Sequence, residues 1–170
     1  MAINSTLSLF FMHSKENVSI RKLQPEERPP YELLLLADES LTAIEKYLPH
    51  SEIYRAEIDG QVIGCYVLYP ETKTVFEIKN IAIAEAFQGQ GLGTQLLHHA
   101  IQNAKEQGAS RLLIGTGNSS FSQLYLYQKV GFRMTGIRRN FFIDNYPEPI
   151  MENKLQLVDM IVLSMDLEKQ

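Results

Sequence analysis

The sequence predicts a single mixed α/β domain with a sheet of six or seven strands and about four helices. Three observations indicate this fold class. Two β-rich runs at 53–58 and 61–69 flank Asp59-Gly60, the dipeptide typical of a tight hairpin turn. The run 74–83 is apolar on both faces, as in a central strand. A glycine-rich turn then leads into a helical pattern that begins near Leu92.

The start of the chain carries a short apolar cluster with no basic residue before it. The cluster is too short to span a bilayer and lacks a small-residue cleavage site, so we expect neither a membrane segment nor a signal peptide. We interpret residues 1–17 as a variable N-terminal extension or a first strand. No linker or internal repeat follows. Residues 18–170 are therefore expected to form one domain.

One strand and two short helices are expected before the hairpin. Residues 18–23 alternate apolar and charged side chains, and a proline-rich stretch ends this strand. The patterns at 31–37 and 41–48 are apolar and helical, and they are separated by the polar joint Asp38-Glu39-Ser40.

Helices and strands alternate after the central strand. The helix from Leu92 presents one apolar face and stops at Gly108, a natural terminator. The later elements are a strand at 112–115, a loop at 115–120, a helix to about Val130, a strand at 132–138, a loop at 144–153 and a last strand at 159–167.

Composition narrows the class of function. The chain has 170 residues, 45% of them hydrophobic, and a formal net charge of −4. These values are typical of a soluble globular protein and argue against a nucleic-acid partner. The one cysteine, Cys65, lies in an apolar run and is expected to be a buried thiol in a cytoplasmic protein. His98 and His99 are expected to be solvated, no metal site is predicted, and a homodimer is compatible with the sequence.

The glycine-rich turn is Gln88-Gly89-Gln90-Gly91-Leu92-Gly93. Glycines let the backbone approach a ligand closely, and the helix that follows directs unpaired N–H groups toward the turn, so an anion site is expected. The spacing does not match a dinucleotide fingerprint, because Thr94 stands where its last glycine belongs. A Walker A loop is also excluded, since no Gly-Lys-Ser/Thr follows. A strand-to-helix turn without a ligand is the plain alternative.

Three motifs resemble the GCN5-related N-acetyltransferase (GNAT) family. The turn fits the family's Arg/Gln-x-x-Gly-x-Gly/Ala, residues 77–83 (Glu-Ile-Lys-Asn-Ile-Ala-Ile) resemble its central strand, and 126–132 (Leu-Tyr-Gln-Lys-Val-Gly-Phe) resemble its Leu-Tyr-x-x-x-Gly-Phe. Residues 138–142 are also similar to bacterial enzymes that acetylate protein N-termini. The motifs span 74–142, and the element order extends the resemblance to 18–167. It implies a mostly antiparallel GNAT-type sheet.

The resemblance implies that acetyl-CoA is the cosubstrate. Its pyrophosphate would lie on the backbone amides of the glycine turn, and its thioester would be polarised by a backbone amide of the central strand near residues 81–83. The residues implied in cofactor binding are Ile81, Ala82, Ile83, Gln88, Gly89, Gln90, Gly91, Leu92, Gly93, Thr94, and either Asn118 or Ser120.

Two of those candidates compete for the pantetheine arm. Many relatives place an asparagine seven residues before the helix tyrosine, and that position here is Ser120, whereas Asn118 lies nine residues before it. We prefer Asn118, because Gly115-Thr116-Gly117 would let the backbone loop out. A helix-capping turn without cofactor contact is the alternative.

By family position, Glu77 and Tyr127 are the candidate catalytic residues. An amine with a pKa of about 10 is protonated near neutral pH, so a base is needed, and desolvation would raise the pKa of Glu77 toward that role. The alternative is a structural ion pair with Lys79 on the same strand face. Tyr127 would protonate the leaving thiolate, or instead be a core tyrosine beside the cofactor, while Tyr125 lies on another helical face.

The sequence therefore predicts an N-acetyltransferase acting on a primary amine, either of a small molecule or of a peptide N-terminus. Direct attack in a ternary complex is expected, since no activated nucleophile is evident. The alternatives are a non-catalytic coenzyme A-binding or sensing module and a nucleotide-binding module. The acceptor is expected near the early helices and the 144–153 loop, where five carboxylates can receive a cation: Asp38, Glu39, Asp144, Glu148 and Glu152.

Overall fold

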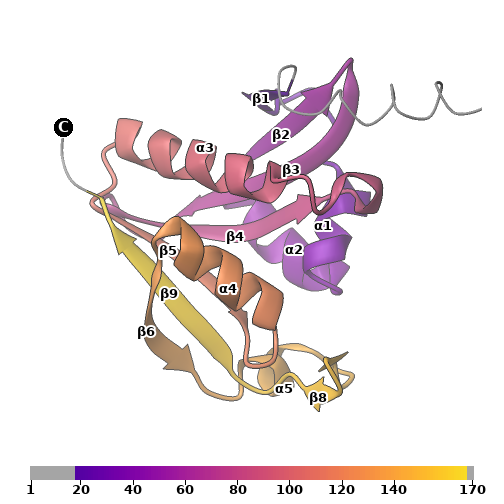
Figure 1. The fold of residues 1–170 in the computed structure, drawn as a ribbon, viewed down its shortest axis with the longest axis vertical. Helices are drawn as coiled ribbons and strands as arrows, with labels where there is room; N and C mark the ends of the chain where they lie inside the picture. Colours follow the sequence, from indigo (N-terminus) through magenta and orange to yellow (C-terminus); the bar gives the residue numbers. More distant parts are fainter. Residues whose placement is uncertain (1–17, 168–170) are drawn as a thin grey trace, which may run out of the picture.

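A computed structural model describes residues 18–167; the predicted extension at 1–17 lies outside the described residues. Seven strands form one sheet in the order β1-β2-β3-β4-β5-β9-β6. Only the β4–β5 pair is parallel; the other neighbours are antiparallel. Figure 1 shows the sheet opening where β4 and β5 diverge. The prediction of a mixed, mostly antiparallel sheet is confirmed.

The first half of the chain follows the predicted order. The Asp59-Gly60 turn has positive φ at both residues (49° and 80°), which is the geometry of the primed hairpin turn expected there. Its elements are β1 (Ser19–Lys22), α1 (Tyr31–Ala37), α2 (Leu41–Tyr47), the 3₁₀ turn η2 (Leu48–His50), β2 (Glu52–Ile58), β3 (Gln61–Pro70) and β4 (Val75–Ile83).

The second half contains elements that the sequence did not predict. The 3₁₀ turn η3 precedes the glycine turn. A short helix, α5, begins before the expected loop at 144–153 and ends inside it, and a small hairpin of β7 and β8 overlaps the end of that loop. The elements are η3 (Glu85–Phe87), α3 (Leu92–Glu106), β5 (Arg111–Gly117), α4 (Phe121–Val130), β6 (Arg133–Arg138), α5 (Phe141–Asn145), β7 (Met151–Glu152), β8 (Leu155–Gln156) and β9 (Met160–Asp166).

The expected loop at 115–120 was also placed too early. Gly115 and Gly117 belong to β5 and pair with Val162 and Met160 of β9. A Cβ at Gly117 would lie 2.6 Å from a methyl group of Leu157. Glycine is therefore needed here because another part of the chain packs closely against the strand, and not because the backbone loops out.

Helices cover both faces of the sheet. Apolar residues of α3 and α4 pack with those of β2–β5 in one core cluster, whereas α1 and α2 pack against the opposite face in a second (Figure 1). Cys65 belongs to the second cluster and is fully buried, and burial raises the pKa of its thiol. The prediction of a buried structural thiol is confirmed.

One predicted histidine environment was wrong. His98 is exposed, but His99 is half-buried, with its Nδ1 2.8 Å from the Tyr66 hydroxyl. Within residues 18–167, no group of three or more His, Cys, Asp or Glu side chains is arranged to hold a metal ion. In the same part of the chain, no helix has the length and apolarity needed to cross a membrane.

Candidate active site

The site lies where β4 and β5 separate. The two strands pair only from Val75 and Arg111 to Ile78 and Ile114, although β4 continues to Ile83 and β5 to Gly117. The β3–β4 register shifts next to this point, since Val67 faces Asn80 whereas Leu68 faces Ile78. Lys79 is thus the extra residue of a β-bulge, a device that bends a strand and leaves backbone groups unpaired.

On one side of the opening, the glycine turn and α3 form a cavity of about 420 Å³, here called the glycine-loop cavity. Gly89 and Gly91 have φ values of 74° and 82°, and no side chain caps the first turn of α3. The first N–H groups of the helix are therefore available to an anion.

Most of the predicted cofactor residues meet in this cavity. Gln90 does not line it; its side chain instead donates to the carbonyl of Ala86 at 3.4 Å. The lining includes Ile81, Ala82, Ile83, Gln88, Gly89, Gly91, Leu92, Gly93 and Thr94.

A second cavity of about 240 Å³, the central cavity, lies deeper between the strands. It shares Ile81, Gln123 and Tyr127 with the glycine-loop cavity, so the two are continuous. Lys79 and Asn80, from the bulged part of β4, also line it. The central cavity therefore joins the unpaired part of β4 to the tyrosine of α4.

Tyr127 is 6% exposed and packs against Phe132, with ring centroids 6.4 Å apart. Burial, with a smaller contribution from Glu152, raises the pKa of its phenol above the ordinary value. The group therefore keeps its proton at neutral pH and remains available as a donor. Tyr125, in contrast, is 66% exposed and lines neither cavity.

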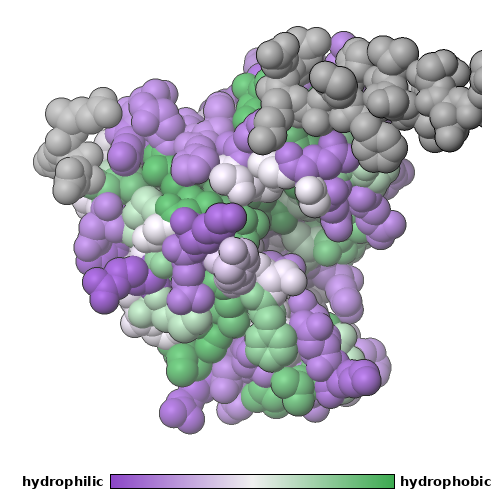
Figure 2. Space-filling model, in the orientation of Figure 1, coloured by the Kyte–Doolittle hydropathy of each residue, from purple (hydrophilic) through white to green (hydrophobic). Residues whose placement is uncertain are grey.

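A third cavity of about 460 Å³, the outer cavity, opens on the other side of the central one. The two share seven lining residues, which include Asp38, Lys79 and Tyr146. Its walls come from the α1–α2 joint, β4, β6 and α5. Ile143, Met151 and Leu155 are exposed on α5, β7 and β8, and Figure 2 shows apolar surface at this end of the molecule.

Glu77 is buried in an ion-pair network. Its Oε2 lies 2.8 Å from Lys79 Nζ and 3.1 Å from an Arg138 nitrogen, and its Oε1 accepts from Arg138 at 3.2 Å. Burial acts to raise the pKa of this carboxyl, but the bonds from Arg138 and Lys79 outweigh it and lower the pKa. The expected rise in the Glu77 pKa was wrong, because Arg138 supplies a second cation from β6.

We expect Glu77→Gln to lower the free energy of unfolding by about 1–3 kcal/mol at pH 7, because the partners of a buried charge are left without it. A carboxyl group whose pKa is lower in the folded state than in the unfolded state stabilises the protein at any pH above the unfolded-state pKa. That stabilisation is lost as the pH falls through the folded-state pKa. The difference from wild type should therefore shrink below about pH 4.5. Urea unfolding between about pH 7 and pH 3 measures it, and a pH-independent difference would contradict this stabilising ion pair.

Asn118 and Ser120 lie in different surroundings. Asn118 Oδ1 accepts from the backbone N–H of Val158 and Asp159 at 2.7 and 3.2 Å, and its Nδ2 donates to Gln156 at 3.2 Å. It lines neither cavity on the cofactor side. Ser120 lines the central cavity and donates to Glu152 at 2.6 Å. The geometry thus favours Ser120 over Asn118 for a cofactor contact, which stays a prediction.

The structure places only some of the carboxylates expected around the acceptor in a cavity wall. Asp38, Glu39 and Glu152 line the central cavity, whereas Asp144 and Glu148 line none of the three. Sequence reasoning missed Gln123, Tyr146 and the role of Arg138 beside Glu77. Gln123 had a usable signal, because it stands one helical turn before Tyr127 and so shares its face.

The chain matches the family described as Acetyltransferase (GNAT) over residues 17–132. A GNAT family acetyltransferase from Elizabethkingia anophelis, solved with acetyl-CoA bound, is 55% identical, with a TM-score of 0.88 over 90% of this chain and all of that one. The IAA acetyltransferase from Bacillus cereus is 48% identical, with a TM-score of 0.85 over 89% of this chain and all of that one. The [ribosomal protein bS18]-alanine N-acetyltransferase of Haemophilus influenzae is 37% identical over 105 residues, which are 62% of this chain and 65% of the relative.

The solved relatives connect the cavities to a ligand. The Elizabethkingia protein binds acetyl-CoA and is related to this chain over nearly its whole length. The glycine loop, the uncapped start of α3 and the open part of β4 are the features that such a ligand requires. The chain therefore belongs to the GNAT family and is an acetyl-CoA-dependent N-acetyltransferase.

Proposed function

We propose that this protein transfers the acetyl group of acetyl-CoA directly to a primary amine of a small molecule or a peptide N-terminus. The observation that carries the proposal is the continuity of the three cavities. The glycine-loop cavity would hold the donor, the outer cavity would hold the acceptor, and the central cavity between them contains the open part of β4 and Tyr127.

The donor would be held mainly by backbone groups. The amides at the start of α3 would bind the pyrophosphate, with Gly89 and Gly91 allowing its close approach. Residues 79–81 of β4 line the central cavity, and they follow the point where β4 stops pairing with β5. A free N–H in this stretch would polarise the thioester carbonyl and stabilise the oxyanion that forms on attack.

Tyr127 would act as the acid. It lines both the glycine-loop and central cavities, and its buried phenol keeps its proton at neutral pH. When the tetrahedral intermediate collapses, the C–S bond breaks and the sulfur takes the phenolic proton, because sulfur leaves more readily as a thiol, whose pKa is about 8.5, than as a thiolate.

Direct transfer is supported by the position of the one cysteine. Cys65 is fully buried in the core and lines none of the three cavities. Because its thiol pKa is raised, it would supply almost no thiolate at neutral pH. A covalent acetyl-cysteine intermediate is therefore disfavoured, and the amine itself would attack the thioester.

An acceptor screen tests the function and the substrate class together. The purified full chain is incubated with acetyl-CoA and with polyamines, aminoglycosides, arylalkylamines, amino acids or peptide N-termini, and free thiol is followed. We expect amine-dependent thiol release with at least one class. A protein that is thermally stabilised by acetyl-CoA but releases no thiol with any amine would instead be the coenzyme A-binding module.

A further inference from the structure

Asp38 stands at the boundary between the central and outer cavities and lines both. Its backbone is extended at the end of α1, which turns the chain out of the helix at this residue. Oδ1 accepts hydrogen bonds from the Ser40 N–H at 3.1 Å and from the Tyr146 hydroxyl at 2.8 Å. Within residues 18–167, Oδ2 has no hydrogen-bonding partner. One carboxylate oxygen is thus anchored and the other is free.

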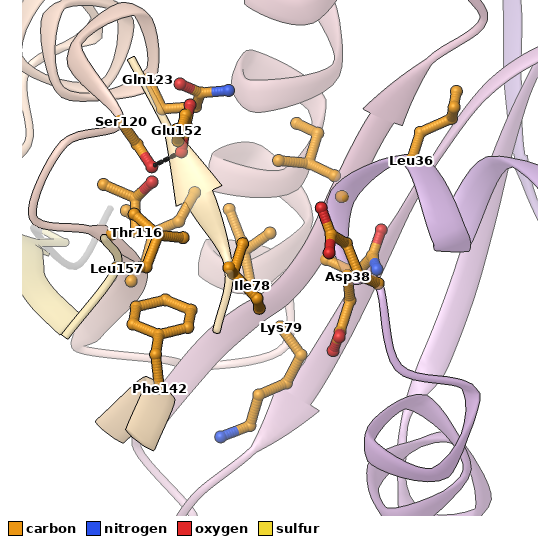
Figure 3. Close-up of a pocket in the computed structure, with 18 of the residues that line it drawn as sticks. Leu36, Asp38, Ile78, Lys79, Thr116, Ser120, Gln123, Phe142, Glu152 and Leu157 are labelled. Atoms are coloured by element: carbon orange, nitrogen blue, oxygen red, sulfur yellow. Dashed lines mark hydrogen bonds between the residues drawn. The ribbon is translucent and has the colours of Figure 1, made fainter. Parts of the chain in front are cut away.

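The close-up view agrees with this position. Figure 3 shows Asp38 across the cavity from the bonded pair of Ser120 and Glu152, while the amino group of Lys79 is directed away from it. Lys79 is occupied elsewhere, since its Nζ lies 2.8 Å from both Glu71 and Glu77. Among the described ion pairs, none includes Asp38. The charge of this carboxylate is therefore not neutralised by a protein cation.

The pKa values of the two carboxyl groups near the reaction centre, Asp38 and Glu77, are shifted in opposite directions. Burial raises the pKa of Asp38 above its ordinary value, and the bonds from Ser40 and Tyr146 offset only part of that rise. The pKa of Glu77 is lowered, and Glu77 lines the outer cavity but not the central one. A carboxylate with the higher pKa and a free oxygen is the better proton acceptor.

The groups that face Asp38 do not replace it as a base. Tyr47 of α2 and Tyr146, which follows α5, both have pKa values raised by burial, so both phenols are neutral near pH 7. Glu39 is the next residue and adds negative charge, and Lys46 of α2 lines the outer cavity. Glu71, Glu77, Lys79 and Arg138 line it as well, but they form ion pairs with one another. Asp38 is therefore a carboxylate outside these ion pairs, and it lies beside phenols that stay protonated near pH 7.

Aromatic rings form much of the wall of the outer cavity. The Phe142 and Tyr146 rings are stacked with centroids 5.7 Å apart, and the Phe141 ring meets Phe142 edge-on at 5.2 Å. Tyr47 and Tyr69 complete this set of lining residues. Such rings bury an apolar body and attract a cation to their faces.

Resting on the proposed function, we propose that Asp38 receives the ammonium group of the acceptor and removes its proton, and that the acceptor is a primary amine with an aromatic or apolar body. The free Oδ2 takes one proton from nitrogen, and the neutral amine then forms a C–N bond to the thioester carbon. As the C–S bond breaks, Tyr127 protonates the sulfur, and the second amine proton restores the phenol through solvent. The products are the amide, the thiol and one proton that Asp38 releases.

Phenethylamine is the probe, because it carries a primary amine on an aromatic body. We expect the wild-type protein to acetylate it, and Asp38→Asn to lower kcat/KM at least about a hundredfold. The asparagine Oδ1 can still accept from Ser40 and Tyr146, so the Kd for acetyl-CoA and the thermal unfolding temperature should not change. Glu45→Gln is the matched control, since Glu45 is exposed on α2 and lines none of the three cavities.

The pH profile separates a base from a merely structural carboxylate. Wild-type kcat/KM should rise with pH and level off once Asp38 is ionised. In Asp38→Asn only the neutral amine reacts, so the rise should continue toward the amine pKa of about 10. Tyr146→Phe removes a hydrogen bond that lowers the Asp38 pKa, and it should move the start of the plateau to higher pH.

Three outcomes would overturn this inference. An Asp38→Asn protein with the wild-type rate and profile would exclude Asp38, and a plateau lost only in Glu77→Gln would assign the base to Glu77. Thiol release with other amines of the screen but not with phenethylamine would reject the acceptor class while leaving acetyl transfer intact. Failure of every amine would reject the proposed function itself.

Discussion

Replacing Tyr127 with phenylalanine should lower kcat at least about tenfold and leave the Kd for acetyl-CoA nearly unchanged. The substitution removes only the hydroxyl, so the ring still fills its buried place beside Phe132. The reaction then has no positioned proton for the departing sulfur. Initial rates of thiol release and calorimetric titration with acetyl-CoA measure the two quantities separately.

The same helix supplies a control for this substitution. Tyr125 is two residues away, is 66% exposed and has no part in the cavities, so Tyr125→Phe should retain wild-type kcat. Full turnover in Tyr127→Phe would show that the tyrosine only packs beside the cofactor. Equal losses in both variants would point to a general effect on α4.

Replacing Gly91 with alanine should weaken acetyl-CoA binding at least about tenfold, which corresponds to about 1.4 kcal/mol. Gly91 has a φ of 82°, caps α3 at its start and lines the glycine-loop cavity. A side chain at this position is strained by about 1–2 kcal/mol in the left-handed region. The new Cβ would also occupy space into which the pyrophosphate must come to reach the helix amides.

A matched substitution at Gly60 separates the effect of backbone strain on stability from the effect of a new Cβ on acetyl-CoA binding. Gly60 has nearly the same φ, 80°, and a Cβ there would meet no atom within 4 Å, as at Gly91. It lies in the β2–β3 turn and lines none of the three cavities. Gly60→Ala and Gly91→Ala should therefore lose similar stability in urea, while only Gly91→Ala loses affinity. Unchanged affinity in Gly91→Ala would place the pyrophosphate elsewhere.

The sequence was most informative where a few adjacent residues decide the geometry. The Asp59-Gly60 turn and the start of α3 after Gly91 follow from short-range backbone preferences, and both appear as expected. The loop at 144–153 was less informative, because α5 and the β7–β8 hairpin are too short to show a hydrophobic period. Gly115 and Gly117 were wrongly assigned to a loop. Glycine is needed at these positions because residues of β9 and of the loop before it pack closely against β5.

By itself, the sequence determined the order of the main strands and helices and the mixed sheet, and it predicted the donor site, since glycines and periodic apolar residues act through their neighbours in the chain. Only the tertiary structure decided which carboxylates are free. Arg138 reaches Glu77 from 61 residues away, and Tyr146 anchors Asp38 from 108 residues away. Charge, burial and pKa depend on distances through space, so these partners became visible only once the strands and helices were packed together.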